Sequence, residues 1–329
     1  MSGRTIKASV LHGAQDLREE DRIIDPPGAG ELQVSIKATG ICGSDQHYYK
    51  HFRNGDIQIR EPMSLGHESS CVVAACSPDV TGFKPGDRVA LERLILVVRL
   101  PDEITAAEGA LLEPLSVAIH AVRRAGLEPE SNVLVLGAGP VGLLLAAMLR
   151  VERVENIAIA DVEQRRVEFA TVNRFADRGV VVPRTGTPAD NTATKLDNAK
   201  KTAELLMDGE EFDAAFECTG VEACVQSAIY STAPSGKVVI IGMGNPVQTL
   251  PLLAASLREV DIVGVFRYAD TYRYGIDVLA RKNEINLPDI PKLLTHRYSG
   301  FQNVPQAFAT AAKTADNDGN LVLKVIIET

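Results

Sequence analysis

Four positions in the first third of the chain carry a thiol, an imidazole or a carboxylate. Cys42 lies in a turn-rich segment, Gly66-His67-Glu68 follows 25 residues later, and Glu113 lies 45 residues beyond Glu68. These groups all bind Zn²⁺, and a catalytic zinc needs three protein ligands and an open position. Each residue also has a simpler interpretation: Cys42 as a buried thiol, His67 as a hydrogen-bonded turn residue, Glu113 as a helix cap. Their joint presence favours a metal site.

A glycine-rich loop occupies the middle of the chain. The sequence Gly137-Ala-Gly139-Pro140-Val141-Gly142 follows a short apolar run and opens a long apolar segment. This strand, loop and helix context is typical of a dinucleotide-binding fingerprint. In that fingerprint the first glycine permits a tight turn, the second lets the backbone approach a pyrophosphate, and the third lets helix and strand pack closely. The alternative is a glycine turn of an α/β domain that binds no cofactor.

An acidic residue follows the loop at the distance that this fingerprint requires. Asp161 ends the next strand-like run, 22 residues beyond Gly139. A carboxylate there accepts hydrogen bonds from the ribose hydroxyls of the adenosine and repels the 2′-phosphate of NADP. The pattern therefore favours NAD, although Arg165 and Arg166 leave a dual preference open.

The elements that position the loop alternate between strand and helix. Alternation of this kind predicts a parallel sheet with helices on both faces, a doubly wound domain over residues 115–264. The expected strands and helices are 133–136, a helix over 141–150, 157–160, a helix over 163–173, 180–182, 212–217, a helix over 222–230, and 237–241. The polar stretch 185–200 is expected to be a loop that leads into a helix.

The segments on either side of this domain have a different character. Residues 1–114 contain short apolar runs broken by Gly and Pro, which predicts a small β-rich domain. The tail over 265–329 combines a helix at 272–281 with strand-like runs at 292–294 and 321–327. We expect this tail to return to the first domain and complete it.

The bulk properties narrow the class of protein. The chain has 329 residues, enough for two domains, and a net charge of −9 with no basic patch. This disfavours nucleic acid and anionic membranes as partners. No apolar segment has the length of a membrane span or the features of a signal peptide, so we expect a cytoplasmic protein. Five cysteines, an odd number, argue against a disulfide framework.

Taken together, the motifs resemble the zinc-dependent medium-chain dehydrogenase/reductase family, and within it the sorbitol, xylitol and L-arabinitol dehydrogenases. The matching segments occur in family order and cover almost the whole chain. They are Gly40-Ile-Cys-Gly-Ser-Asp45, Leu65-Gly-His-Glu68, Gly82-Phe-Lys-Pro-Gly-Asp-Arg-Val89, Leu111-Leu-Glu-Pro-Leu-Ser116, Gly137–Gly142, Phe216-Glu-Cys-Thr-Gly220 and Phe266-Arg-Tyr268.

The resemblance implies a fold and a set of site residues. The fold is α/β: a GroES-like β-rich catalytic domain, 1–114 and 265–329, around an inserted Rossmann domain. One catalytic zinc would be held by Cys42, His67 and Glu68, with Glu113 beside its water or as a fourth ligand. Ser44 would help to relay the proton. The polyol pocket would be lined by Tyr48, Arg267 and Tyr268. The residues that would contact NAD are Gly137, Gly139, Pro140, Val141, Gly142, Asp161, Arg166, Ile241, Gly242, Met243, Val265, Phe266 and Arg267.

The activity implied by the resemblance is hydride transfer from a secondary hydroxyl of a polyol to NAD, with zinc polarising the hydroxyl. Relatives form dimers or tetramers, so a homo-oligomer is expected. Two alternatives stay open. The chain could bind NAD with little or no activity, or it could oxidise another secondary alcohol. Arg267 also has a simpler interpretation as a surface residue after a strand.

The chain departs from the family after Glu92. Relatives usually carry a lobe there with four clustered cysteines for a structural zinc. Here Glu92 runs into an apolar stretch that ends at Leu100, with no cysteine, and several tens of residues are absent by comparison. A structural zinc is therefore not expected. Loss of the lobe would remove strands and a wall of the substrate pocket; a naturally shortened form, a splice product or a faulty gene model would each explain it.

Overall fold

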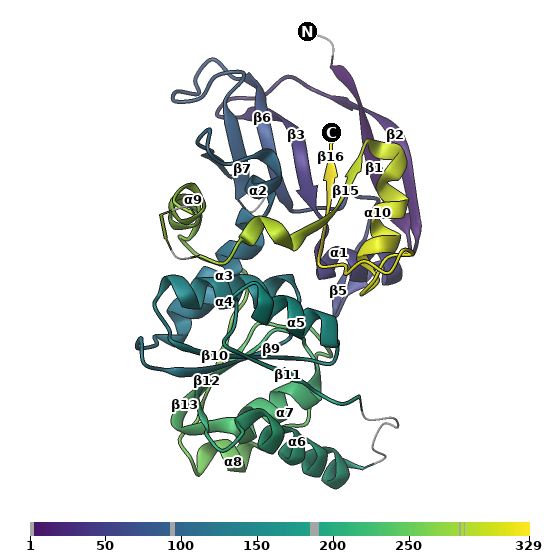
Figure 1. Cartoon of the computed structure of the whole chain (residues 1–329). Coiled ribbons are helices and arrows are strands. Elements are labelled where there is room, and N and C mark those ends of the chain that lie inside the picture. The colour runs from purple at the N-terminus through teal and green to yellow at the C-terminus, as the bar shows by residue number, and fades with distance from the viewer. Residues whose placement is uncertain (1–2, 93–95, 185–190, 283, 286) are drawn as a thin grey trace. The chain divides into compact units, whose positions relative to one another are not determined.

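The structure is a computed structural model, and it describes residues 3–92, 96–184, 191–282, 284, 285 and 287–329 (Figure 1). The chain divides into two compact units. Unit 1 comprises Met1–Glu113, Tyr272–Arg281 and Pro291–Thr329; unit 2 comprises Pro114–Thr271 and Lys282–Ile290. Compared with the expected division, unit 2 also contains Pro114, residues 265–271 and Lys282–Ile290. Residues 265–271 follow directly from its last strand, and the Val265 amide donates to the Ile240 carbonyl at 2.9 Å.

Unit 2 is built on a six-stranded sheet in the order β11-β10-β9-β12-β13-β14, in which every pair is parallel. This is the strand order of a dinucleotide-binding Rossmann fold. The strands are β9 Asn132–Leu136, β10 Asn156–Asp161, β11 Arg178–Val181, β12 Phe212–Glu217, β13 Thr232–Ile240 and β14 Asp261–Gly264. The helices are α3 Leu112–Ala125, which begins at the end of unit 1, α4 Pro140–Val151, α5 Gln164–Val172, α6 Thr192–Met207, α7 Glu222–Ser231 and α8 Leu252–Ser256.

The central strands of unit 2 are apolar on both faces because helices cover both. In β9, residues 133–136 are all buried, and in β10 the same holds for residues 157–160. Such continuous apolar runs are the signature of buried parallel strands. α4 carries an unbroken buried stretch over residues 142–149, so this helix is buried around its whole circumference.

Unit 1 is a β-rich unit with mostly antiparallel pairing. Its larger sheet has the order β15-β16-β3-β6-β7-β8, and β1 pairs with β2 in a separate ribbon. The strands are β1 Arg4–Gly13, β2 Asp16–Ile24, β3 Leu32–Gly40, β4 Arg53–Asn54, β5 Ile57–Gln58, β6 Glu68–Cys76, β7 Arg88–Glu92, β8 Leu96–Arg99, β15 Leu294–Ser299 and β16 Lys324–Glu328. The helices are α1 Gly43–His51, α2 Ala106–Ala110, α9 Tyr272–Ala280 and α10 Val304–Ala311, with short 3₁₀ turns η1 Ile290–Leu293 and η2 Phe301–Asn303.

The strands β7 and β8 lie where the sequence comparison predicted the absence of a lobe after Glu92. β7 and β8 pair antiparallel, from Val89 opposite Arg99 to Glu92 opposite Leu96. Only residues 93–95 connect the two strands, and they lie outside the described residues. β8 therefore follows β7 directly and forms one edge of the larger sheet.

The fold class predicted from the sequence is confirmed, with local corrections to two strands. The strand expected over 321–327 begins only at Lys324, as β16. Residues 292–294 were expected to form a strand, but Pro291 fixes its own φ and η1 forms first, so the strand begins only at Leu294. The expected loop over 185–200 lies partly outside the described residues, and α6 begins at Thr192. No helix in the described part of the chain is both long and apolar enough to cross a membrane.

Candidate active site

Cys42 sits at the start of a helix. It is the residue before α1, and its backbone amide donates to the Asp45 carboxylate at 3.0 Å. Asp45 also accepts from the Gly66 amide at 3.2 Å, so one buried carboxylate joins the Cys42 turn to the segment before β6.

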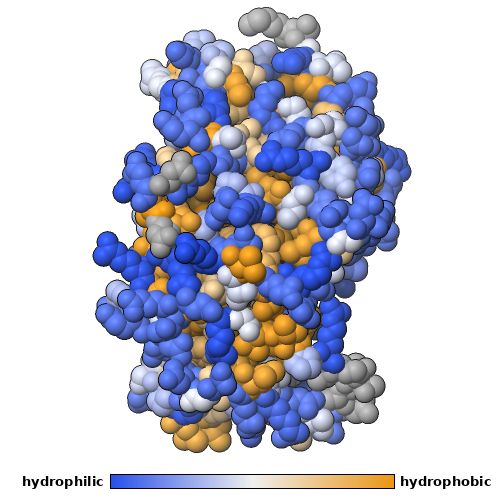
Figure 2. Space-filling view, viewed as in Figure 1, coloured by the Kyte–Doolittle hydropathy of each residue, from blue (hydrophilic) through white to orange (hydrophobic). Residues whose placement is uncertain are grey.

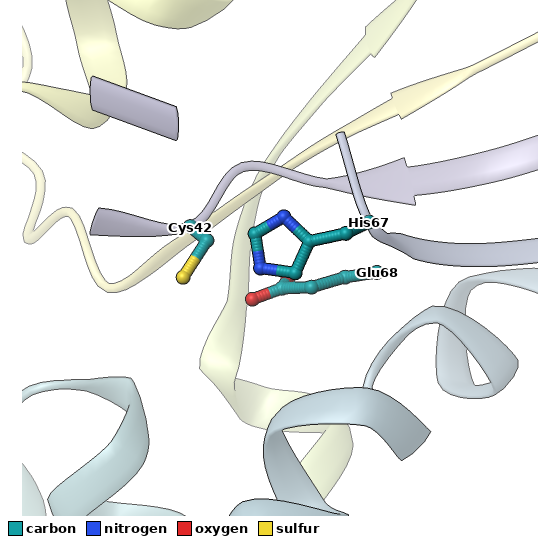
Figure 3. A group of neighbouring side chains, drawn as sticks. All are labelled: Cys42, His67 and Glu68. Atoms are coloured by element: carbon teal, nitrogen blue, oxygen red, sulfur yellow. The ribbon is translucent and has the colours of Figure 1, made fainter. Parts of the chain in front are cut away.

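Three of the predicted ligands come together. One ligand atom from each of Cys42, His67 and Glu68 lies within 4.8 Å of the other two. Figure 3 shows the sulfur, a ring nitrogen and the carboxylate facing a common point. Cys42 and His67 are half-buried and Glu68 is fully buried at the start of β6. Sulfur, nitrogen and oxygen donors at this spacing fit a tetrahedral zinc with its fourth position open.

Asp45 orients the imidazole of His67. Its carboxylate lies 3.3 Å from Nδ1, which leaves Nε2 as the atom for a metal. Burial by itself lowers the pKa of His67, but hydrogen bonds to Asp45 and Cys42 outweigh it and raise the pKa to about 12. The metal-free site thus keeps a proton on His67, which a metal has to displace. Sequence reasoning missed Asp45 as a functional residue, although it stands in the same motif as Cys42.

Lys324 is a second residue that the sequence analysis missed. It is the first residue of β16, is 3% exposed, and its ammonium donates to Glu68 Oε1 at 2.6 Å. Burial lowers the pKa of Lys324, but the charges of Glu68, Cys42 and Glu113 outweigh this and raise it above the usual value. Glu68 Oε2 also contacts the Lys324 ammonium, so both carboxylate oxygens of Glu68 face this cation. In the sequence, a single lysine within the apolar run 321–327 was the feature that could have pointed to Lys324.

The other predicted residues of unit 1 are Ser44 and Tyr48, which follow Cys42 closely in the chain, and Glu113, which lies 45 residues beyond Glu68. Glu113 is buried in the first turn of α3, and it is not among the three side chains that share the 4.8 Å spacing. Ser44 and Tyr48 are half-buried on α1. Their assigned roles remain predictions.

The glycine loop of unit 2 has the geometry of a dinucleotide cradle. Gly137 has φ of +102°, which a side chain rarely adopts, and a Cβ on Gly142 would lie 1.9 Å from the Gly137 carbonyl oxygen. Gly139, Pro140 and Val141 form the start of α4, whose free amides favour a phosphate group. The shape of this loop therefore requires glycine at residues 137 and 142.

Asp161 has a second task in the structure. One carboxylate oxygen accepts from the Ala138 amide at 2.8 Å and the other from the Glu163 amide at 2.9 Å. It thereby ties the glycine loop to the end of β10. Arg166 follows on α5, and its guanidinium lies 3.9 Å from where a Cβ of Gly139 would be. Both predicted residues therefore lie at the loop.

Two more turns border the glycine loop at the carboxyl ends of β12 and β13. The buried Glu217 accepts from the amides of Thr219 and Gly220, and its own carbonyl accepts from the amides of Ile241 and Gly242. A Cβ on Gly242 would lie 2.0 Å from the Gly220 nitrogen, so the two turns touch. Met243 is exposed beside them. Glu217 is a third residue that the sequence analysis did not single out.

The segment after β14 carries the last group of predicted residues. Val265 is half-buried, Phe266 is 69% exposed, and Tyr268 is buried. The Arg267 guanidinium carbon lies 5.9 Å from the Phe266 ring centroid, and Arg267 has a left-handed φ of 54°. Such a conformation in a non-glycine residue is uncommon and occurs often at binding sites.

Comparison with known proteins shows the family to which the chain belongs. The alcohol dehydrogenase GroES-like domain matches residues 28–106, and the zinc-binding dehydrogenase domain matches residues 140–281. Sorbitol dehydrogenase of Gallus gallus is 36% identical over 93% of this chain and 93% of its own length. Sorbitol dehydrogenase of Bos taurus is 34% identical over 97% of this chain and 95% of its own length.

The fold also matches a solved structure. An Escherichia coli alcohol dehydrogenase complexed with NADH superposes with a TM-score of 0.82 at 22% identity, covering 99% of this chain and 100% of that one. At this identity the likeness concerns the fold. The two domain matches and the identity to the curated relatives decide the family. The chain belongs to the zinc-dependent medium-chain dehydrogenase/reductase family, in the branch of the sorbitol dehydrogenases, and is an oxidoreductase.

Proposed function

We propose that this protein oxidises a secondary hydroxyl of a polyol to a ketone with NAD as hydride acceptor and one catalytic zinc. The observation that carries the proposal is the group of Cys42, His67 and Glu68, whose donor atoms lie within 4.8 Å of one another. Sorbitol dehydrogenases match 93% and 97% of this chain, which supports a sugar alcohol as the substrate class.

In unit 1 the proposed task of the protein is to hold the hydroxyl and move its proton. Zinc, when bound, would polarise the hydroxyl and lower its pKa. Asp45 fixes the His67 ring so that Nε2 faces the metal. Ser44, half-buried in the first turn of α1, and the buried Glu113 are proposed to carry the hydroxyl proton outward.

In unit 2 the proposed task is to bind and orient the dinucleotide. The α4 amino end would take the pyrophosphate, and Asp161 the adenosine ribose. Because Asp161 is fixed by two amide donors, its charge stays beside that ribose and disfavours a 2′-phosphate. Val141, Arg166, residues 241–243 and residues 265–267 are proposed as further contacts. NAD would supply the hydride chemistry itself.

Substrate recognition is proposed for three residues. Tyr48 of α1 and the pair Arg267 and Tyr268 each offer a hydrogen-bond donor to a polyhydroxylated chain. The left-handed Arg267 beside the exposed Phe266 ring supports a role at a binding surface.

The test is metal analysis and turnover on the same preparation. We expect about one zinc per chain and NADH formation with sorbitol, xylitol or L-arabinitol but not with ethanol. Zinc without NADH formation on any polyol would contradict the substrate class. Bound NADH without zinc or turnover would favour the cofactor-binding alternative.

We further propose that the protein is a homo-oligomer. β14 has a sheet neighbour on one side only among the described strands, and next to it in the chain Leu252, Leu253 and Leu257 are 57%, 71% and 78% exposed. Figure 2 shows apolar surface at the lower end of the view, where α8 lies in Figure 1. An unpaired edge strand beside an apolar helix suits two-fold pairing with a second copy. Light scattering of a Leu253→Asp, Leu257→Asp variant tests this: a mass that stays unchanged would contradict it.

A further inference from the structure

Lys324 is a buried cation inside the candidate metal centre. Its neighbours in the chain are apolar: Val322 and Leu323 precede it, and Val325 and Ile326 follow. The ammonium donates to Glu68 Oε1 at 2.6 Å and to the Ile41 carbonyl at 3.2 Å, and it also contacts Glu68 Oε2. Lysine and glutamate side chains are 4% and 1% exposed. The pair is therefore shielded from solvent on both sides.

The surrounding backbone leaves space for this pair. A Cβ on Gly40, the last residue of β3, would lie 2.1 Å from Glu68 Oε2 and 3.0 Å from Lys324 Cε. β3 is the strand between β16, which carries Lys324, and β6, which carries Glu68. The missing side chain at residue 40 is thus what lets the two charges meet across the middle strand.

A buried carboxylate is costly unless a cation neutralises it. In the protein without metal, Lys324 is the cation that does so for Glu68. A divalent metal bound by Cys42, His67 and Glu68 would offer the same carboxylate a second positive partner. A carboxylate that already binds one cation attracts a second less strongly, so each cation weakens the hold of the carboxylate on the other.

We propose that Lys324 competes with the catalytic metal for the Glu68 carboxylate, so that it stabilises the metal-free protein and loosens the bond between Glu68 and the metal. The inference rests on the proposed function, because it needs the metal to bind at this site. Lys324 is a positioning residue in this scheme: it acts on the metal only through Glu68. A weakly donating carboxylate leaves the metal more electron-poor, which favours polarisation of a bound hydroxyl.

The experiment compares Co²⁺ binding to the metal-free full chain in three variants. Lys324→Met removes the ammonium, Lys324→Arg keeps a cation, and Lys313→Met is the control on an exposed lysine of the same unit. We expect Lys324→Met to bind Co²⁺ about tenfold more tightly than the unchanged protein, with a shifted visible absorption band. Its metal-free form should unfold at lower temperature. The arginine and control variants should bind Co²⁺ within about threefold of the unchanged protein.

Unchanged or weaker Co²⁺ binding by Lys324→Met would overturn the proposal. If Lys324 were only structural, its loss would lower the unfolding temperature of the metal-free and the Co²⁺-bound protein by similar amounts. If that variant does not fold, Lys324→Gln, whose amide still donates to Glu68, serves in its place with the same expectation. The pair Glu68→Gln and Glu68→Gln/Lys324→Met should show equal Co²⁺ affinity, because the charged carboxylate is gone. Absence of Co²⁺ binding by the unchanged protein would instead overturn the metal site and the proposed function with it.

Discussion

The glycine loop of unit 2 and the metal cluster of unit 1 are assembled in opposite ways. The loop is local: Gly137 and Gly142 are five positions apart, and what matters is backbone free of side chains. The cluster is non-local: Cys42 follows β3, Glu68 begins β6, and Lys324 begins β16. The loop therefore depends on one strand and one helix, whereas the cluster depends on the pairing of three strands. Changes in one should leave the other intact.

The largest expected effect is at His67. We expect His67→Ala to abolish zinc binding and polyol oxidation, because two ligands are too few for a catalytic site. NADH affinity should stay within about twofold, since the glycine loop is built from β9 and α4 of unit 2 and contains none of the three metal ligands. Zinc analysis and NADH fluorescence on the same sample measure both. Loss of NADH binding together with zinc would show that the two regions are coupled.

Gly142→Ala is the matching change in unit 2. The added Cβ would lie 1.9 Å from the Gly137 carbonyl oxygen, so the loop must shift. We expect a loss of about 2–3 kcal/mol in the free energy of unfolding and little remaining NADH binding. Zinc content should not change. Gly264→Ala is the control, because nothing lies within 4 Å of its Cβ position. Normal NADH binding by Gly142→Ala would contradict the close packing described here.

Asp45→Asn tests how much the Asp45 carboxylate contributes to zinc binding by orienting His67. The amide keeps the shape of the side chain but loses the charge that fixes His67. We expect zinc affinity to fall about 10–100-fold, measured by competition with a chelator. Asp102→Asn is the control, because the Asp102 side chain is fully exposed. Equal affinity in the two variants would mean that Asp45 serves only the turn around Cys42.

The smallest expected change, about tenfold in zinc affinity for each pH unit, is the response to pH. Because the pKa of His67 is raised to about 12, the metal-free protein holds a proton there at neutral pH. Zinc must displace it, so affinity should rise about tenfold per pH unit between about pH 6 and 8. In the metal-free protein the raised pKa of His67 also stabilises the fold. This contribution is fully present at pH values below the pKa of His67 in the unfolded chain, and it is lost as the pH rises toward 12. Zinc titrations at several pH values measure the slope; a flat profile would contradict it.

The sequence predicts the loop far better than the cluster. The run Val133–Leu136 and the acid at Asp161 lie within one strand–helix–strand unit, so local patterns suffice to place them. Cys42, His67 and Glu68 could be proposed as ligands only from residue type and from the resemblance to a family. The pairing of Lys324 with Glu68 joins residues 256 positions apart and depends on β16 entering the sheet beside β3. No local pattern contains that information.

The place of β16 in the sheet has a consequence for biosynthesis. β16 lies between β15 and β3, yet it emerges from the ribosome after all of unit 2. Domains fold as units during translation. The dinucleotide-binding unit can therefore fold while the nascent amino-terminal segment still lacks its closing strand. Until Lys324 arrives, Glu68 has no ammonium to neutralise it, so metal uptake by an unfinished chain would compete with correct closure of the sheet.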